Sequence, residues 1–127
     1  IFVLFVIGDY ANLGTNTPDV SYPLGTVFGY EVIASIFLMG VIYIVVHFKK
    51  LRMLTGVAIG GIIAIDVLLF GEISGASMNP IRSLAPAIIS GTPNDLWLYW
   101  TTPFIGMLMV AVIFKALSRR IKNTSTH

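Results

Sequence analysis

Long apolar segments alternate with short polar segments along the chain. Residues 26–48 form an apolar run with a single charge, Glu31, and this run leads into a basic loop at residues 49–53. A second apolar run covers residues 54–71 and a third covers residues 95–118. A helix needs about 20 residues to cross a bilayer, so the pattern predicts three complete membrane-spanning helices.

The remaining segments are shorter or more polar. Residues 1–7 are hydrophobic but have neither a Met start nor a basic region, so we interpret them as the end of a preceding helix and not as a signal peptide. Residues 8–25 contain two prolines, two acids and several Gly, Asn and Thr residues, which indicate an outer loop. Residues 119–127 are polar and basic and are expected to form a cytoplasmic tail.

Composition supports an all-α membrane protein. Of the 127 residues, 56% are hydrophobic and 11% are charged, and the charges gather at the ends of the apolar runs. The chain has no cysteine, which excludes disulfides and thiolate metal sites, and we expect neither a metal nor another cofactor. The net charge of +2 comes from clusters at membrane borders, so no nucleic-acid partner is expected. No nucleophile, base and oxyanion donor converge, so an enzyme is not expected.

Basic residues predict the orientation in the membrane. All but one of the eight Lys and Arg residues fall at two of the borders: Lys49, Lys50, Arg52, Lys115, Arg119, Arg120 and Lys122. Positive loops stay in the cytoplasm, which places residues 49–53 and the C-terminus there. Trp97, Tyr99 and Trp100 open the third span, where an aromatic interfacial belt is expected.

This orientation makes residues 72–94 a re-entrant segment. The second span ends outside and the third begins outside, but the residues between them are too few to cross the bilayer and return as two helices. They must therefore enter the membrane and turn back as a loop and half-helix, which is tolerated only where protein or water surrounds the backbone.

Asn79, Pro80 and Arg82 give this segment its chemistry. Asn79 is a favoured N-cap and Pro80 a favoured first helical residue, so the half-helix should begin there and run to about residue 90. Its N-terminus carries free amide donors and about half a positive charge. Arg82 lies three residues after Asn79 and can share its face. Such a wall passes small neutral solutes and repels cations.

Residues 75–87, Gly-Ala-Ser-Met-Asn-Pro-Ile-Arg-Ser-Leu-Ala-Pro-Ala, resemble the second Asn-Pro-Ala loop of the aquaporin, or major intrinsic protein, family. Glu31 and the helix that begins at Trp97 also resemble the family. The resemblance implies an aquaporin-like right-handed helix bundle of six helices and two half-helices, built from two inverted repeats and usually assembled as a homotetramer. This chain would supply the second repeat: the end of helix three, helices four to six and one half-helix.

The family's pore residues can be carried over to matching positions. Asn79 and Pro80 match the Asn-Pro-Ala motif, whereas Ile81 replaces its alanine, a change that bears on packing against the other repeat and on pore width. Glu31 would support the loop by accepting hydrogen bonds from its backbone. Metal and catalytic residues are not implied.

Three residues match the family's selectivity filter: Arg82, Val67 and Ala76. Val67 stands where strict water channels commonly have His, so the filter should be wider and more apolar. This combination is similar to the nodulin-26-like and glycerol-conducting branches, and it makes glycerol, urea and metalloid acids candidate solutes beside water. Asp66 and Glu72 replace the Asn and Pro that nodulin-26-like members often have, and they are candidate pore-facing acids.

The resemblance therefore implies a passive channel for water and small neutral solutes that excludes protons and ions. Its expected partners are the lipid bilayer, in a plasma or cell membrane, and the N-terminal half of the same channel with the first Asn-Pro motif. Two other readings stay open. Inverted repeats and broken helices also occur in secondary transporters, and the chain could be a truncated half-channel that has no activity alone.

Overall fold

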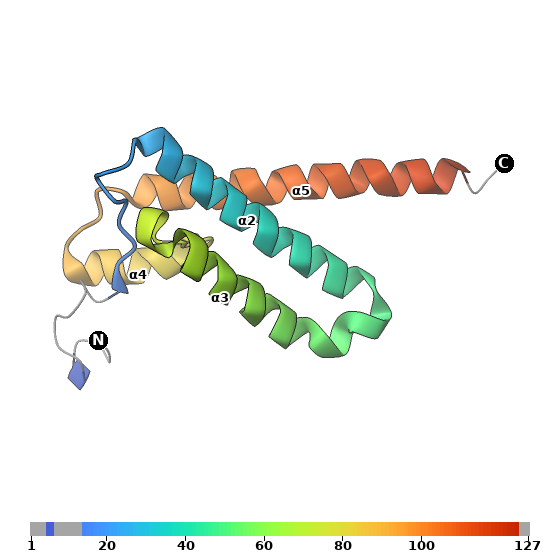
Figure 1. Cartoon of the computed structure of the whole chain (residues 1–127), viewed down its shortest axis with the longest axis horizontal. Helices are drawn as coiled ribbons and strands as arrows, with labels where there is room; N and C mark the ends of the chain where they lie inside the picture. The colour runs from blue at the N-terminus through green and yellow to red at the C-terminus, as the bar shows by residue number, and fades with distance from the viewer. Residues whose placement is uncertain (1–4, 7–13, 125–127) are drawn as a thin grey trace.

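The computed structural model describes residues 5–6 and 14–124, with side chains described as far as Arg119. Most of the helix end expected at residues 1–7, and the first part of the loop expected at residues 8–25, lie outside this description. The described elements are helical: α2 (Leu24–His47), the 3-10 helix η2 (Lys49–Leu54), α3 (Thr55–Ser74), α4 (Pro80–Ser90) and α5 (Leu96–Thr124) (Figure 1).

Three of these helical stretches are long and apolar enough to cross a membrane: Leu24–His47, Lys49–Ser74 and Leu96–Arg119. The all-helical membrane fold with three spans is therefore confirmed. The largest differences from the expected bounds are at the C-terminal ends of α3 and α5, and the other helix ends lie within two residues of those expected. α3 continues through Gly71 to Ser74, and Gly75 ends the helix with a φ of 87°. α5 continues past residue 118 to Thr124, because the intervening residues are compatible with a helix.

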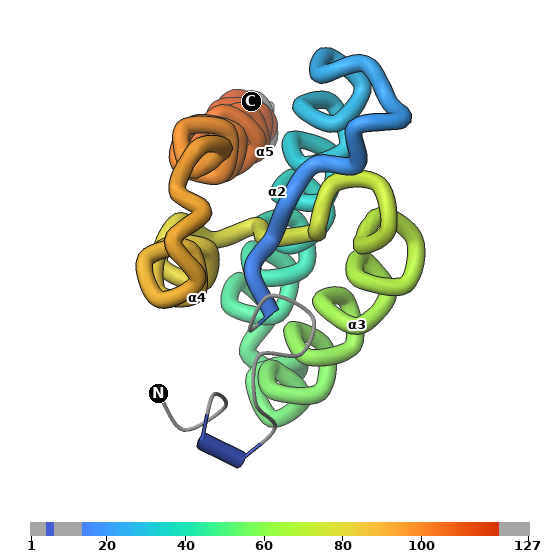
Figure 2. Tube along the Cα trace, turned by 90° about the vertical axis from the view of Figure 1, so that its left-hand side faces the viewer, coloured from blue at the N-terminus to red at the C-terminus, as the bar shows by residue number. Residues whose placement is uncertain are grey.

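Helix α2 is the centre of the bundle. It packs against α3 on one side and α5 on the other, while the short α4 packs against α5 (Figures 1 and 2). In the view of Figure 2, the segment that joins α3 to α4 crosses the interior between these helices. The packing therefore buries the middle of this segment, residues 76–78, inside the bundle, whereas Asn79 is exposed.

Gly106 sets how closely α5 approaches α2. A Cβ atom added at Gly106 would lie 2.6 Å from the carbonyl oxygen of Val32 and 2.8 Å from Cβ of Ser35. Small residues at membrane helix crossings let the backbones approach in this way. The close approach of α2 and α5 accordingly depends on the absence of a side chain at Gly106.

The core is built around the loop. One buried cluster contains Ala34 and Leu38 of α2 together with Ala76 and Met78 of the loop, and residues of α3 and α5 pack against it. Several polar side chains are also fully buried: Glu31, Ser35, Asp66, Ser74, Ser77, Ser83 and Thr102. Buried polar groups need partners, and most of these residues are tied to the loop or to their own helix.

Candidate functional site

The loop between α3 and α4 has an unusual backbone. Ala76 has a φ of 42° and Met78 a φ of 54°, so two residues with side chains adopt the left-handed region. For a non-glycine residue this conformation costs about 1–3 kcal/mol, and it persists only where the surrounding structure holds the residue there. Both residues are buried, at 0% and 2% exposure. The loop conformation therefore depends on contacts from other elements.

Glu31 provides the main contact. Its Oε1 accepts the backbone N–H of Ser77 at 2.9 Å, and its Oε2 accepts the backbone N–H of Met78 at 3.2 Å. The side chain is completely buried. Hydrogen bonds from backbone amides to a carboxylate are among the stronger ones in proteins. Glu31 on α2 thus holds the two consecutive peptide groups at the centre of the loop.

A chain of side-chain hydrogen bonds fixes the next part of the loop. The Oγ of Ser77 donates to the carbonyl of Asn79 at 2.8 Å and lies 2.5 Å from the Oγ of Ser83. Since the Ser77 proton is used for Asn79, the Ser83 hydroxyl donates to Ser77. Ser83 in turn accepts the amide N–H of Asn16 at 2.8 Å. The segment near residue 16 is thereby connected to Asn79.

Asn79 begins helix α4. Its φ of −152° is extended, and its Oδ1 accepts the N–H of Ile81 at 2.9 Å, which caps the helix. Pro80 occupies the first turn, where its missing N–H costs nothing. Ile81 is 64% exposed among the described residues. Gly91, with a φ of 73°, ends the helix at its other side.

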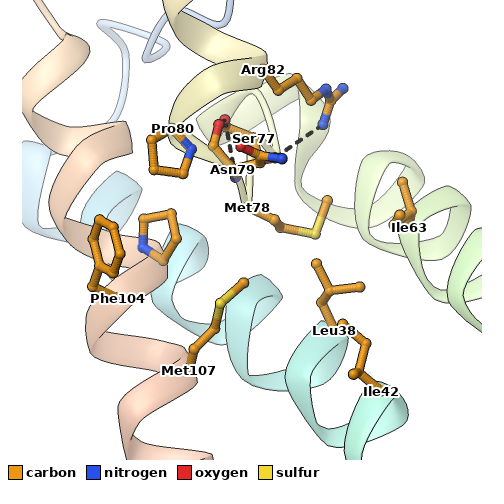
Figure 3. A pocket seen from close by; sticks show the side chains of 11 residues that line it. Leu38, Ile42, Ile63, Ser77, Met78, Asn79, Pro80, Arg82, Phe104 and Met107 are labelled. Atoms are coloured by element: carbon orange, nitrogen blue, oxygen red, sulfur yellow. Dashed lines mark hydrogen bonds between the residues drawn. The ribbon is translucent and has the colours of Figure 1, made fainter. Parts of the chain in front are cut away.

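Arg82 folds back over the loop. Its Nη1 donates to the carbonyl oxygen of Ala76. It also donates to that of Ser77 at 3.4 Å, and Figure 3 shows Arg82 beside Ser77. In the part of the chain that the structure describes, these two carbonyls are its hydrogen-bond partners, and no carboxylate is paired with it. The side chain remains exposed. The loop therefore presents a positive charge that two backbone carbonyls hold in place.

These groups open onto a cavity of about 430 Å³, which we call the central pocket (Figure 3). Asn79, Pro80 and Arg82 line it together with Ser77. The rest of its wall is apolar and comes from the loop and three helices: Leu38, Ile42, Ile63, Met78, Pro103, Phe104 and Met107. A few polar groups thus converge on a largely apolar space, an arrangement typical of sites for small molecules.

A second cavity of about 440 Å³, the loop pocket, lies where residues 14–17 meet the end of α3. Val67 and Glu72 line it, together with Gly71 and Gly75. The structure therefore places Val67 beside a different cavity from Arg82. Ala76, which lies between Val67 and Arg82 in the sequence, is fully buried. Its carbonyl accepts a hydrogen bond from Arg82.

Asp66 is placed apart from both cavities. It is completely buried and is not among the residues that line either pocket. Neither carboxylate oxygen has a hydrogen-bond partner within the described residues. The two candidate acids thus have different surroundings, since Glu72 is exposed in the loop pocket and Asp66 is buried in the interior of the helix bundle.

Tyr99 has a role that the sequence did not indicate. It was expected in an interfacial belt with Trp97 and Trp100, but it is only 1% exposed, whereas the two tryptophans are 49% and 44% exposed. Its hydroxyl donates to the carbonyl of Ser74 at 2.6 Å. The belt interpretation is therefore wrong for Tyr99, which ties α5 to the end of α3 just before the loop.

Asn16 and Ser83 were also missed. Their types are ordinary for a loop and a helix, and the only signal is the number of hydroxyl residues around the Asn-Pro pair. With regard to metals, residues 5–6 and 14–124 contain no group of three His, Asp or Glu side chains that could hold an ion.

Comparison with known proteins assigns the chain to a family. Residues 1–114 match the model of the major intrinsic protein family. Aquaporin NIP3-1 of Zea mays is 33% identical over 114 residues, which cover 89% of this chain and 38% of that protein. Aquaporin NIP3-1 of Arabidopsis thaliana is 46% identical over 101 residues, which cover 79% of this chain and 31% of that protein.

A third plant relative, the probable aquaporin NIP7-1 of Arabidopsis thaliana, is 42% identical over 74 residues, covering 58% of this chain and 27% of that protein. The chain spans about a third of the length of these curated relatives. These NIP relatives accord with the resemblance to the nodulin-26-like branch. With a family match over residues 1–114 and an all-helical fold with three membrane spans, the chain belongs to the major intrinsic protein family.

Proposed function

We propose that the chain forms one half of a passive channel for water and small neutral solutes. The observation that carries the proposal is the loop at residues 75–79, whose strained backbone is held by Glu31 and whose carbonyls position Arg82 beside the central pocket. Asn79, Pro80 and Ile81 are the pore motif. Such a wall binds a solute through hydrogen bonds and needs no chemical step, as expected of a channel and not of an enzyme.

Electrostatics supports the exclusion of protons and other cations. The N-terminus of α4 carries a partial positive charge from the helix dipole, even though Asn79 caps the N–H of Ile81. Arg82, one turn into the same helix, adds a full charge that no carboxylate pairs with among the described residues. A cation that left bulk water would meet both, whereas water and neutral solutes would not be repelled.

Val67, Ala76 and Arg82 are the proposed selectivity filter on this half of the channel. Val67 and Ala76 offer no polar side-chain atom, so Arg82 and backbone carbonyls would provide the hydrogen bonds. A filter with small apolar sides leaves room for glycerol, urea or metalloid acids in addition to water. The apolar lining of the central pocket fits solutes that are not charged.

A complete pore requires a second wall. We place the N-terminal half of the same channel, with the first Asn-Pro motif, opposite the central pocket, and we expect homotetramers in a plasma or cell membrane. The loop at residues 49–53 and the C-terminus would face the cytoplasm, and the loop pocket would face outward. A secondary transporter or an inactive half-channel is the alternative.

Reconstitution of the channel tests the proposal. The complete channel, which unites this chain with its N-terminal half, is placed in proteoliposomes, and water and glycerol fluxes are measured by stopped-flow light scattering. Fluxes should exceed those of empty vesicles and should be unchanged by an imposed proton gradient. A flux that follows the proton gradient would identify a transporter, and no flux would indicate an inactive assembly.

The role of Arg82 is tested in the same vesicles with Arg82→Val, which removes the charge and widens the filter. Cation leak should rise about tenfold or more, because a unit charge in a partly buried site changes the barrier by more than about 1.4 kcal/mol. Arg52→Gln is the control, since Arg52 is exposed in η2, away from both pockets. Unchanged leak and solute flux in Arg82→Val would overturn the assignment.

A further inference from the structure

Glu72 lies in a cavity that the motif residues do not line. Resting on the proposed channel function, we infer that Glu72 is a specificity-determining residue at the loop pocket, where its carboxylate selects small neutral solutes with several hydroxyl groups. It would bind them before they reach Val67.

The loop pocket is formed by two chain segments. Residues 14–17 form one side, and Val67, Gly71, Glu72 and Gly75 form the other, enclosing about 440 Å³. Asn16 packs directly against Gly75, and Gly71 adds no side chain beside Val67. Val67 and Glu72 lie five residues apart on α3 and line the same space. A solute in the pocket can therefore contact the acid and the proposed filter residue together.

The wall formed by residues 14–17 is fixed to the rest of the structure. Asn16 donates to Ser83 at 2.8 Å, and Thr15 is hydrogen-bonded to Ser90 at 3.0 Å. The backbone N–H of Asp19 donates to the carbonyl of Ile73 at 3.1 Å. The geometry of the pocket is thus set by contacts with both α3 and α4.

Gly75 shows how tightly this wall fits. A Cβ atom there would lie 2.9 Å from Cβ of Asn16, so the segment rests directly on the turn that precedes the pore loop. The φ of 87° at Gly75 is also one that other residues rarely adopt. The contact fixes the position of residue 16 relative to the end of α3.

Glu72 is uncommitted in this setting. Its side chain is exposed, and it forms no hydrogen bond or salt bridge with any residue in the described ranges. The described residues that line the pocket include no Lys or Arg, so none of them neutralises its charge. Of the lining side chains, those of Thr15, Asn16 and Thr17 are polar and uncharged. Among the described residues that line the pocket, Glu72 therefore provides the only formal charge.

The chemistry of a carboxylate defines the solute. Its two oxygens are acceptors only, and they can accept two hydroxyl groups of one molecule at the same time. A polyol with neighbouring hydroxyls fits this pair of oxygens. At the pocket it can replace hydrogen bonds to water with hydrogen bonds to the carboxylate. A water molecule gains little, because another water replaces it at equal cost, and an anion is repelled. The pocket should thus favour polyols over water.

Glu72→Gln tests the inference, because it keeps the size of the side chain and removes the charge and one acceptor. In proteoliposomes of the complete channel, the ratio of glycerol to water permeability should fall by about three- to tenfold, the expected net effect of losing one hydrogen bond. Glu72→Asp, which retains the carboxylate, should recover much of the ratio.

Asp19→Asn is the matched control. Asp19 is an acid on the same loop, but it does not line the pocket, and its carboxylate accepts the N–H of Ser21 at 2.8 Å, a bond that Asn can retain. Its permeability ratio should equal that of the wild type. If the wild type conducts both solutes and Glu72→Gln keeps the ratio, the role of Glu72 is overturned while the channel stands.

Two further results have distinct meanings. If the wild type conducts neither water nor glycerol, the proposed function falls and the inference falls with it. If Glu72→Gln leaves the ratio unchanged but alters block by an added monovalent cation, Glu72 is a cation site and the polyol assignment is overturned.

Discussion

Glu31 and Ser77 are 46 residues apart in the sequence, yet the carboxylate of one accepts the backbone N–H of the other at 2.9 Å. The second oxygen of Glu31 accepts the next amide, that of Met78. A single side chain on a membrane helix therefore fixes two peptide groups of a loop that has no regular structure. The position of the loop depends on α2 as much as on its own sequence.

Replacing Glu31 should destabilise the loop. Glu31→Ala would leave two buried N–H groups without an acceptor and would release the left-handed backbone at Ala76 and Met78, at a cost of roughly 2–4 kcal/mol. Glu31→Gln keeps one acceptor and should lose less. Thermal unfolding of the purified complete channel in detergent checks this order. Equal stability of the Ala variant and the wild type would contradict the role of Glu31.

Gly106→Ala should weaken the crossing of α2 and α5. The new methyl group would lie 2.6 Å from the carbonyl oxygen of Val32, so the helices would have to separate, at a cost of about 1–3 kcal/mol. Gly60→Ala is the control, because nothing lies within 4 Å of its added Cβ. Thermal unfolding should distinguish the two variants. A Gly106→Ala protein as stable as Gly60→Ala would show that the helices do not need this close approach.

Tyr99→Phe should loosen the end of α3. It removes the hydroxyl that donates to the Ser74 carbonyl at 2.6 Å and leaves a buried acceptor unpaired, at a cost of about 1–2 kcal/mol. Backbone hydrogen exchange in residues 70–78 should become faster. Tyr22→Phe serves as the control, since Tyr22 is 43% exposed. If both variants exchange like the wild type, the Tyr99 hydroxyl does not restrain the loop.

Local signals predicted the elements better than the contacts between them. The Asn-Pro pair and Gly91 delimit α4 at Pro80 and Ser90. These ends could be predicted because helix caps depend on residues that are adjacent in the sequence. The end of α3 was harder to predict, because the helix continues through Gly71 and ends only at Gly75. The burial of Tyr99 could not be seen, because its aromatic neighbours in sequence point elsewhere and its partner, Ser74, lies on another helix.

The same limit applies to the site. The periodicity of α3 does not tell whether Asp66 faces a pore or a neighbouring helix. A carboxyl group in a membrane span is compatible with either environment. The packing against α2 decides it, and Asp66 is buried while Glu72 reaches a cavity. The contact of Asn16 with Ser83 joins residues 67 positions apart, and no pattern within either segment encodes it.

The hydrogen bonds of Arg82 also determine the shape of its electric field. An arginine paired with a carboxylate acts at a distance as a dipole, and its potential falls off steeply. Arg82 is hydrogen-bonded to the neutral carbonyls of Ala76 and Ser77 and not to a carboxylate, so the Glu31 carboxylate offsets its charge only through space and only in part. The potential of the remaining net charge decays more slowly and reaches further into the neighbouring space. An ion would therefore sense Arg82 well before touching it, while an uncharged molecule would meet it only on contact.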